Sequence, residues 1–356
     1  MAGDLEEIRQ LRLPRLIATG VDYNDVATVF GRLKKMSDWW TQWESMAEFH
    51  EKLGDEAMTA GNALTASRAW LRAAAYYQTG QAGNVADPAG KLRVQLRQQA
   101  VYDKARAHMR PPSARITVPF DGIEFAANLR LPAGTGMVPC VLLNAGADST
   151  KEEFHTLENE FLDRGLATCS YDGPGQSTTW QKRKLRPDFE KPVGAVLDAL
   201  SKHPRVDADR FGIWGRSFGG YTGPRSISLE KRLKACVSCG GFYDLGELWG
   251  PLLPGVKEVI AFGMGAKSID EAGEWAKQYT LRGVLEKLDR PMLVVHSDKD
   301  EVCPVADAER MRKAAPKHVE LAIFPEGNHC CDNLPYKVRP VMADWLAAKL
   351  GAKAPG

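Results

Sequence analysis

The chain has 356 residues, of which 44% are hydrophobic and 26% charged, a composition ordinary for a soluble globular protein of about two domains. Its formal net charge of +2 is too small to indicate a nucleic acid or an anionic membrane as a partner. No apolar run approaches the roughly 20 residues of a membrane span. The first seven residues are acidic and lack a signal-peptide pattern, so we expect a cytoplasmic protein.

Residues 1–110 predict an all-helical N-terminal region. Apolar side chains such as Trp39 and Trp43 recur at three- to four-residue steps, and strand patterns are nearly absent. We expect the tryptophans to pack between helices, while the alternative is that some line a pocket against the following domain. Three glycines divide the pattern and are expected to mark helix ends: Gly54, Gly61 and Gly80.

The pattern changes at Arg110–Ser113, and residues 111–350 alternate short apolar runs with helical stretches. This alternation predicts an α/β domain with a mostly parallel eight-stranded sheet. Asp121-Gly122 is a hairpin signal, so the sheet should begin antiparallel. The expected strands are Arg115–Phe120, Ile123–Leu131, Val138–Asn144, Ala167–Tyr171, Phe211–Trp214, Ala235–Cys239, Met292–His296 and Val319–Phe324. Helices are expected to begin near Glu152, Pro192, Phe218, Val305 and Pro335.

The strand pattern lapses between Tyr243 and Arg290. Residues 246–265 are rich in Gly, Pro and Trp, and Ile269–Tyr279 has a helical pattern. We therefore predict a small cap inserted at about residues 244–288.

The segment Gly215–Gly219 carries the pattern Gly-x-Ser-x-Gly at the end of a predicted strand. In this pattern a sharp strand-to-helix turn exposes the serine hydroxyl, and glycines on either side let the backbone close without a Cβ clash. The pattern is the nucleophile elbow of the α/β-hydrolase fold, and it makes Ser217 the candidate nucleophile.

The acid of a catalytic triad should follow a later strand. Asp300 stands just past the run ending at His296, where α/β sheets place their chemistry. Asp298 and Glu301 are rivals, interpreted as solvated loop carboxylates. The histidine should follow the last strand, where His329 arrives on a loop.

His329 would take the proton of Ser217 during attack, and Asp300 would fix the imidazole tautomer. His296 is expected to pack or to give a supporting hydrogen bond. The oxyanion hole should use the N–H of Phe218 and one from the loop after the third strand. In that loop, Ala147 is the first candidate and Asp148 the second. The segment Asp172–Ser177 is interpreted as a turn that also forms part of the pocket wall.

Seven cysteines are an odd number without disulfide spacing. Cys236-x-x-Cys239 lies in a predicted buried strand, whose alternation places the two side chains on opposite faces. We interpret these residues and Cys330-Cys331 as packed thiols rather than metal ligands.

These motifs resemble a family of C–C bond hydrolases that includes 2,6-dihydroxypseudooxynicotine hydrolase of bacterial nicotine breakdown and the fungal pigment hydrolases that shorten polyketide chains. The resemblance implies a helical N-terminal region that covers the hydrolase domain, and a homodimer with its active site between the domains. It covers most of the chain and is carried by Gly20–Tyr23, Asp148–Glu153, Tyr171–Gln176, Gly215–Ser217, Gly240–Leu245 and His329–Leu334.

One feature departs from that family. The resemblance implies an additional glutamate in the cap, but Asp244–Gly250 differs in sequence. Glu247 is the nearest candidate for this accessory role, and the alternative is a surface carboxylate. The departure puts a nicotine-derived substrate in doubt and leaves the hydrolase interpretation intact.

The leading hypothesis is a serine hydrolase that acts on a small molecule, either at a C–C bond of a β-diketone or acyl-aromatic compound or at an ester. The triad serves both chemistries, and the resemblance favours C–C hydrolysis. A non-catalytic binding module is the alternative from another class, although such proteins usually lose a triad residue. No Walker loop, H-E-x-x-H or dinucleotide fingerprint is present, so no cofactor or metal is expected.

Overall fold

The computed structural model describes residues 5–354, and its contacts divide the chain into two compact units. The helical unit contains the residues up to Ala114 together with Glu152–Leu157, and the sheet unit contains Arg115–Lys151 and the residues from Glu158 onward. The expectation of no signal peptide rests on residues 1–7, of which residues 1–4 lie outside the described residues. None of the described helices combines the length and apolar character that crossing a bilayer needs.

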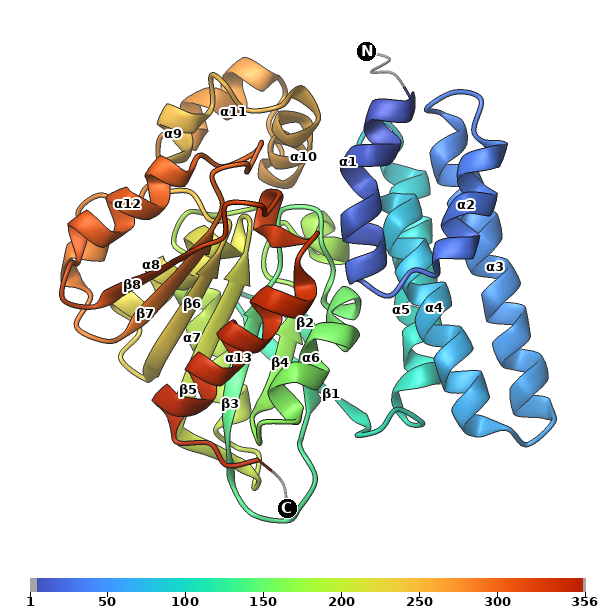
Figure 1. Cartoon of the computed structure of the whole chain (residues 1–356), viewed down its shortest axis with the longest axis horizontal. Coiled ribbons are helices and arrows are strands. Elements are labelled where there is room, and N and C mark those ends of the chain that lie inside the picture. Colours follow the sequence, from blue (N-terminus) through green and yellow to red (C-terminus); the bar gives the residue numbers. More distant parts are fainter. Residues whose placement is uncertain (1–4, 355–356) are drawn as a thin grey trace. The chain divides into compact units, whose positions relative to one another are not determined.

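Over the described residues up to Ala114, the helical unit has five α-helices, drawn in blue to cyan in Figure 1. Trp39 and Trp43 are almost fully buried and pack against each other and against Phe30. The indole N–H of Trp39 donates to the carbonyl of Thr79 at 3.1 Å. These tryptophans therefore form the core between helices. The helices are α1 Leu5–Ala18, α2 Tyr23–Arg32, α3 Asp38–Thr59, α4 Ala63–Gln81 and α5 Pro88–Arg106.

Gly54 does not end a helix, contrary to the prediction, because it lies inside α3. A Cβ at this position would come within 2.4 Å of the Trp70 ring, so the glycine makes room for an indole from α4. Gly61, with φ +80°, does separate α3 from α4, and Gly80 lies in the last turn of α4. Glycine thus has two opposite uses here, a turn and a close helix contact.

The sheet unit contains an eight-stranded sheet in the order β1-β2-β4-β3-β5-β6-β7-β8. From β4 to β8 the neighbouring strands are parallel, while β2 pairs with β4 antiparallel. Asp121 and Gly122 both have positive φ in the two-residue turn between β1 and β2, which confirms the hairpin. The strands are β1 Ser113–Phe120, β2 Ile123–Arg130, β3 Val138–Asn144, β4 Ala167–Tyr171, β5 Val206–Arg216, β6 Leu233–Cys239, β7 Met292–His296 and β8 Val319–Ile323.

Helices cover both faces of this sheet. A Cβ on Gly212 of β5 would lie 2.8 Å from Leu350 of α13, while Gly223 of α8 faces the thiol of Cys236 on β6. Gly212 and Cys236 lie on opposite faces, because Gly212 is in register with Ala235, the residue before Cys236. Figure 1 accordingly shows α13 in front of the strands and α8 behind them. The connecting helices are α6 His155–Leu162, α7 Glu190–Leu200, α8 Gly219–Leu229, α12 Val305–Ala314 and α13 Pro335–Leu350.

Three helices follow β6, where the sequence predicts the cap: α9 Leu245–Leu248, α10 Pro254–Met264 and α11 Ile269–Ala276. Helix α10 was not predicted, because the glycine and proline content of its surroundings hid the helical pattern. Pro254 stands in its first turn and Gly265 ends it in the left-handed conformation, which are the usual end signals of a helix.

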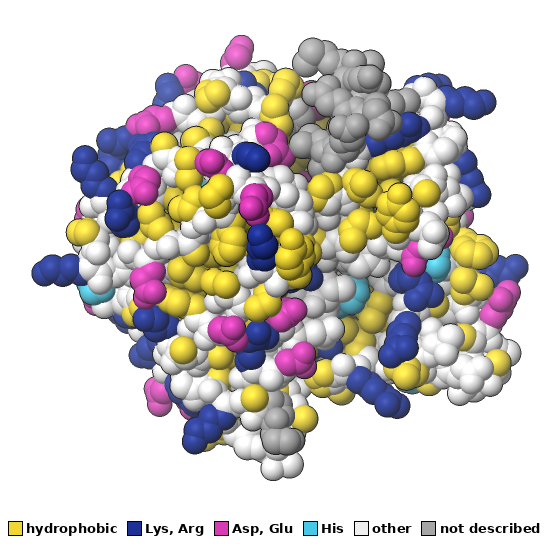
Figure 2. Space-filling model, in the orientation of Figure 1, with side chains coloured by type: hydrophobic (Ala, Val, Ile, Leu, Met, Phe, Trp, Pro, Cys, Tyr) yellow, Lys and Arg dark blue, Asp and Glu magenta, His cyan; other side chains and the backbone are white. Residues whose placement is uncertain are grey.

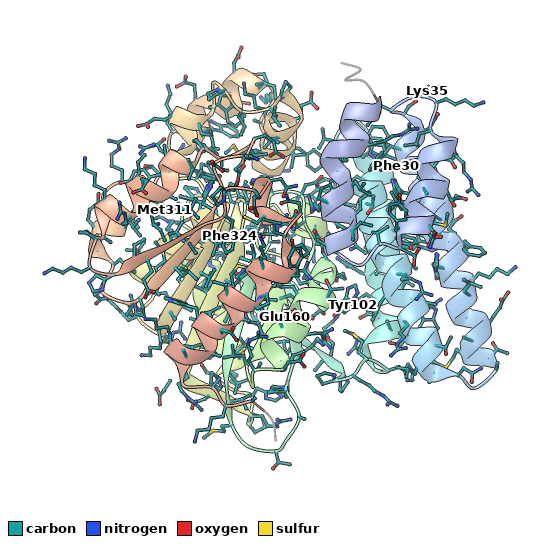
Figure 3. The ribbon with its side chains drawn as sticks, viewed as in Figure 1. Phe30, Lys35, Tyr102, Glu160, Met311 and Phe324 are labelled. Carbon is teal, nitrogen blue, oxygen red and sulfur yellow. The ribbon has the colours of Figure 1, made fainter. Side chains whose placement is uncertain are left out.

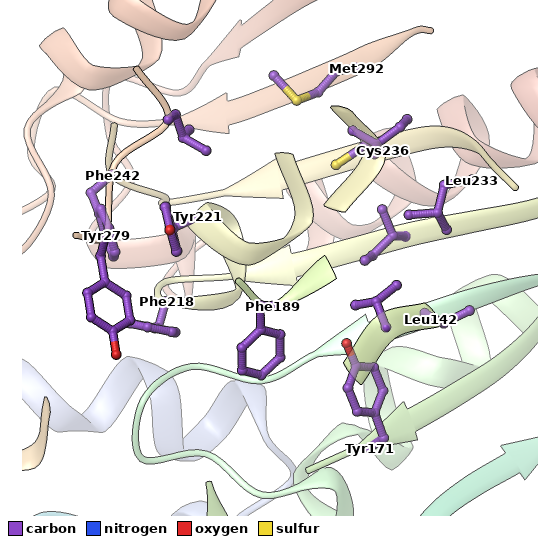
Figure 4. Packing of buried hydrophobic residues seen from close by; sticks show 14 of the residues in the cluster. Leu142, Tyr171, Phe189, Phe218, Tyr221, Leu233, Cys236, Phe242, Tyr279 and Met292 are labelled. Atoms are coloured by element: carbon purple, nitrogen blue, oxygen red, sulfur yellow. The ribbon is translucent and has the colours of Figure 1, made fainter. Parts of the chain in front are cut away.

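Apolar side chains form the core of each unit, and most charged side chains lie on the surface. In Figure 3, Phe30 and Tyr102 lie among the helices of the helical unit. Figure 2 shows basic and acidic side chains mixed over the visible face, in keeping with the net charge of +2. Figure 4 shows the aromatic part of the core in the sheet unit, where Phe218, Tyr221 and Phe242 pack together.

The close approach at Gly54 generates a stability prediction. We expect Gly54→Ala to lower the free energy of unfolding by about 1–3 kcal/mol, because the new methyl group overpacks against Trp70. Gly31→Ala is the matched control: Gly31 lies within α2, and an added methyl group would meet nothing within 4 Å. That control should gain about 0.5–1 kcal/mol from helix propensity. Urea unfolding of both variants measures this, and equal stabilisation by both would contradict the packing argument.

Candidate active site

Ser217 lies on the sharp turn between β5 and α8. Its φ is +54°, a left-handed conformation that costs energy for a residue with a side chain. A Cβ on Gly215 would lie 2.0 Å from the carbonyl oxygen of Gly219, and one on Gly219 would lie 2.3 Å from that of Asn144. The glycines of the motif are therefore required by backbone contact, and the turn leaves Ser217 partly exposed.

Asp300 and His329 come together from two loops that follow neighbouring strands. His329 Nδ1 lies 2.9 Å from each carboxylate oxygen of Asp300. Asp300 Oδ1 also accepts from the N–H groups of Val302 and Cys303, at 2.9 and 2.8 Å. Its side chain is 1% exposed, so the carboxylate is held from several sides. Such a carboxylate fixes the tautomer of the ring it faces.

The rival carboxylates differ from Asp300 in their exposure. Asp298 and Glu301 are exposed on the loop that carries Asp300. His296 is buried, and its Nδ1 accepts the N–H of Ser297 at 2.9 Å while Nε2 lies 3.3 Å from the carbonyl of Gly241. His296 is thus a packed residue whose hydrogen bonds go to the backbone.

The surroundings of Asp300 and His329 shift both pKa values toward the charged forms. Burial raises the pKa of Asp300, but His329 and the N–H of Cys303 outweigh it, so that pKa lies below its usual value. Burial lowers the pKa of His329, whereas Cys330 and Asp300 raise it, and the net result is a pKa above the ordinary value. The carboxylate therefore stays ionised while the imidazole gains affinity for a proton.

The loop after β3 runs beside the elbow. A Cβ on Gly146 would lie 3.4 Å from Cβ of Ser217, so this glycine packs directly against the candidate nucleophile. Ala147 and Asp148, the two candidate donors of the oxyanion hole, follow immediately and are half-buried. Phe218 begins the first turn of α8, where backbone N–H groups have no partner within the helix.

Buried polar side chains that were not predicted from the sequence hold this loop. Gln176 contacts its first residues, and Lys151 at its far end forms a buried ion pair with Asp172 at 2.8 Å. The turn itself was recognised at Asp172–Ser177, but its polar side chains gave no pattern that ties them to another loop. Their burial is visible only in the structure, where Gln176 is 2% exposed.

Glu247 occupies the first turn of α9 with a side chain that is 53% exposed. Its carboxylate is ion-paired with Arg282 and lies 2.8 Å from Arg310. These contacts match the surface-carboxylate interpretation.

The cysteines are free, buried thiols. Cys330 and Cys331 follow His329 with φ of +58° and +55°, so the chain turns sharply after the histidine. Cys330 Sγ packs 3.5 Å from the carbonyl of Cys239, and a Cβ on Gly240 would lie 2.8 Å from the same sulfur. The thiols therefore fill the space under the histidine loop. Within the described residues, no group of three or more His, Cys, Asp or Glu side chains could hold a metal ion.

Two family models match the chain. The model described as esterase FrsA-like covers residues 14–248, and that of the prolyl oligopeptidase family covers residues 158–353. Among curated relatives, the 2,6-dihydropseudooxynicotine hydrolase of Paenarthrobacter nicotinovorans is 34% identical over 342 residues, which are 96% of this chain and 92% of that protein. The 20-hydroxy-prefusarin hydrolase FUS2 of Gibberella moniliformis is 33% identical over 67% of this chain and 62% of its own length.

Solved structures agree with these matches. The crystal structure of the 2,6-dihydroxy-pseudo-oxynicotine hydrolase has a TM-score of 0.89 at 34% identity and 97% coverage of both chains. The structure of AbyA5 wildtype, at 22% identity and a TM-score of 0.79, shares the fold. Since the parallel sheet, the elbow and matches over nearly the whole length agree, the chain is a hydrolase that belongs to the α/β-hydrolase superfamily and, within it, to the esterase FrsA-like family.

Proposed function

We propose that the protein is a serine hydrolase that cleaves an acyl bond of a small molecule through Ser217, His329 and Asp300. The observation that carries the proposal is the buried Asp300–His329 pair at 2.9 Å in a unit whose β5–α8 turn holds Ser217 in a left-handed conformation. A serine on a strained turn and an imidazole oriented by a carboxylate are the nucleophile and the base of a catalytic triad.

In the proposed reaction, Ser217 Oγ attacks the substrate carbonyl and His329 accepts its proton. Asp300 stabilises the imidazolium, and the N–H groups of Phe218 and Ala147 bind the oxyanion. The C–C or C–O bond to the leaving group then breaks, and His329 returns the proton to the departing carbon or oxygen. Water, deprotonated by His329, attacks the acyl-enzyme, which releases a carboxylic acid and frees Ser217.

We favour C–C hydrolysis of a β-diketone or acyl-aromatic compound, since the chain resembles C–C bond hydrolases over most of its length. A carboxylesterase is the second candidate, and the description of the matching family as esterase FrsA-like supports it. The surface position of Glu247 favours a substrate other than a nicotine derivative.

The proposal also includes the organisation inferred from sequence: a helical region over residues 1–110, a catalytic domain over residues 111–350 with a cap at about 244–288, and a cytoplasmic homodimer. Light scattering on the purified protein tests the dimer.

The first prediction about activity concerns the nucleophile. Incubated with matched β-diketones and aryl esters, the wild-type protein should cleave the diketones faster, and Ser217→Ala should lose about 10³-fold or more in kcat. Mass spectrometry of the products identifies the bond broken. Faster ester cleavage would move the protein to the carboxylesterases, and turnover that survives Ser217→Ala would overturn the serine mechanism.

The second prediction separates Asp300 from its rival. Asp300→Asn should lower kcat by about 10³–10⁴-fold, because the amide cannot hold the same tautomer or stabilise the imidazolium. Asp298→Asn is the matched control on the same loop, and its exposed side chain should leave kcat within about twofold. Steady-state kinetics of the two variants decide, and similar losses in both would remove Asp300 from the triad.

The third prediction concerns pH. Since neutral His329 is the base, kcat/KM should rise as the pH rises through the pKa of the imidazole, and it should be low at pH values below that pKa. That inflection should lie above the ordinary histidine value of about 6.5, because Cys330 and Asp300 raise the pKa of His329. In Asp300→Asn the residual activity should show a lower inflection. An unchanged inflection would show that the carboxylate does not act on this histidine.

A further inference from the structure

Gln176 uses its whole carboxamide on the backbone around the candidate oxyanion loop. Nε2 donates to the carbonyl oxygens of Ala145 and Gly146, both at 3.1 Å. Oε1 accepts the N–H of Gly173 at 3.0 Å. With 2% of its surface exposed, the side chain is a buried bridge between the turn after β4 and the loop after β3.

Chemistry fixes the orientation of this amide. Carbonyl oxygens only accept and the N–H of Gly173 only donates. If the amide were flipped, its oxygen would point at two carbonyl oxygens, and no hydrogen bond could form there. Buried polar groups left without partners cost about 1–3 kcal/mol each. Gln176 therefore holds both carbonyls in one direction.

That direction determines where the N–H groups point. In a trans peptide the C=O and the following N–H lie on opposite sides. With the carbonyl of Gly146 turned toward Gln176, the N–H of Ala147 is turned away from it. The backbone of Gly146 itself lies against Ser217, since a Cβ there would be 3.4 Å from Cβ of the serine.

A second contact secures the other end of the loop. Asp172 accepts from the backbone N–H and from Nζ of Lys151, both at 2.8 Å, and both side chains are almost fully buried. One turn, residues 172–176, thus clamps the loop of residues 145–151 at both ends.

We infer that Gln176 is a positioning residue of the hydrolytic reaction, which orients the Gly146–Ala147 peptide so that the Ala147 N–H meets the oxyanion formed on Ser217. The inference rests on the proposed serine mechanism. Gln176 itself does not touch substrate, and its effect belongs to the transition state, where the oxyanion exists, rather than to substrate binding.

Gln176→Met tests this, since methionine keeps the length but offers no N–H. The loss of one oxyanion donor lowers kcat by about 10²–10³-fold in other enzymes, so we expect about 10²-fold here with KM within about threefold. Affinity for an arylboronic acid, whose adduct with Ser217 is a tetrahedral anion, should fall in parallel with kcat. A variant with wild-type kcat and boronate affinity would overturn the inference.

Gln176→Glu adds a readout that a merely structural role would not move. A protonated carboxyl can donate to one carbonyl, whereas a carboxylate can donate to neither. The ratio of variant to wild-type kcat should therefore fall as pH rises, while for Gln176→Met it should stay constant. A flat ratio for Gln176→Glu would contradict positioning by donation. This readout also decides the question if Gln176→Met fails to fold.

Thr179→Val is the matched control, in the short 3-10 helix Ser177–Gln181 that directly follows the turn. The Thr179 hydroxyl contacts the carbonyl oxygens of Gly173 and Gln176, so its removal loosens the turn but keeps the amide. It should lower the melting temperature and leave kcat within about threefold. A loss of kcat equal to that of Gln176→Met would assign the effect to the turn as a whole.

Failure of the underlying mechanism has a separate signature. If wild-type protein shows no Ser217-dependent turnover and no labelling of Ser217 by a fluorophosphonate, the serine mechanism is wrong. If Ser217 is labelled and turns over substrate but Gln176→Met does so at the wild-type rate, the mechanism stands and the inference about Gln176 falls.

Discussion

The close packing of backbone around Ser217 is the constraint on which the rest of the sheet unit depends. Gly220 at the start of α8 would strike the Cα of Gly241 at 2.6 Å if it carried a Cβ, so α8 rests directly on the chain that leaves β6. The N–H of Ser217 donates to the carbonyl of Cys239 at 2.9 Å. These contacts hold the elbow in its conformation, and the surrounding packing offsets the cost of its positive φ.

The other proposed catalytic groups lie at the same edge of the sheet, because the carboxyl ends of parallel strands lie at one edge. β3, β5, β7 and β8 run parallel within one sheet, and the loops that follow them carry Gly146, Ser217, Asp300 and His329. The proposed site residues can therefore lie far apart in the sequence and still follow strands that end at the same edge of the sheet. What matters is the loop length after each strand and the hydrogen bonds that fix each loop, such as those from Val302 and Cys303 to Asp300.

Much of this could be predicted from sequence, for reasons that lie in local chemistry. The limits of β3 and β7 follow from mostly apolar runs, and those of β4 from a run that also contains Thr168 and Ser170. The elbow follows from glycines at which an added Cβ would overlap backbone atoms. Gly54 was misassigned because a glycine that admits an indole from another helix looks the same in sequence as one that ends a helix. Helix α10 is hard to predict because its end signals, Pro254 and Gly265, are also typical of irregular chain.

Gln176 was missed for a different reason. A buried amide that bonds only to backbone carbonyls leaves no pattern in its partners, since any residue supplies a carbonyl. There is nevertheless a physical reason for an amide rather than a charged side chain at position 176. An amide supplies two donors without a net charge, and the charge of Asp172 in the same turn is balanced by Lys151 at 2.8 Å. The turn therefore fixes the loop beside Ser217 while it adds no unbalanced charge, so the field at a developing oxyanion is left to the N–H groups of the loop and of α8.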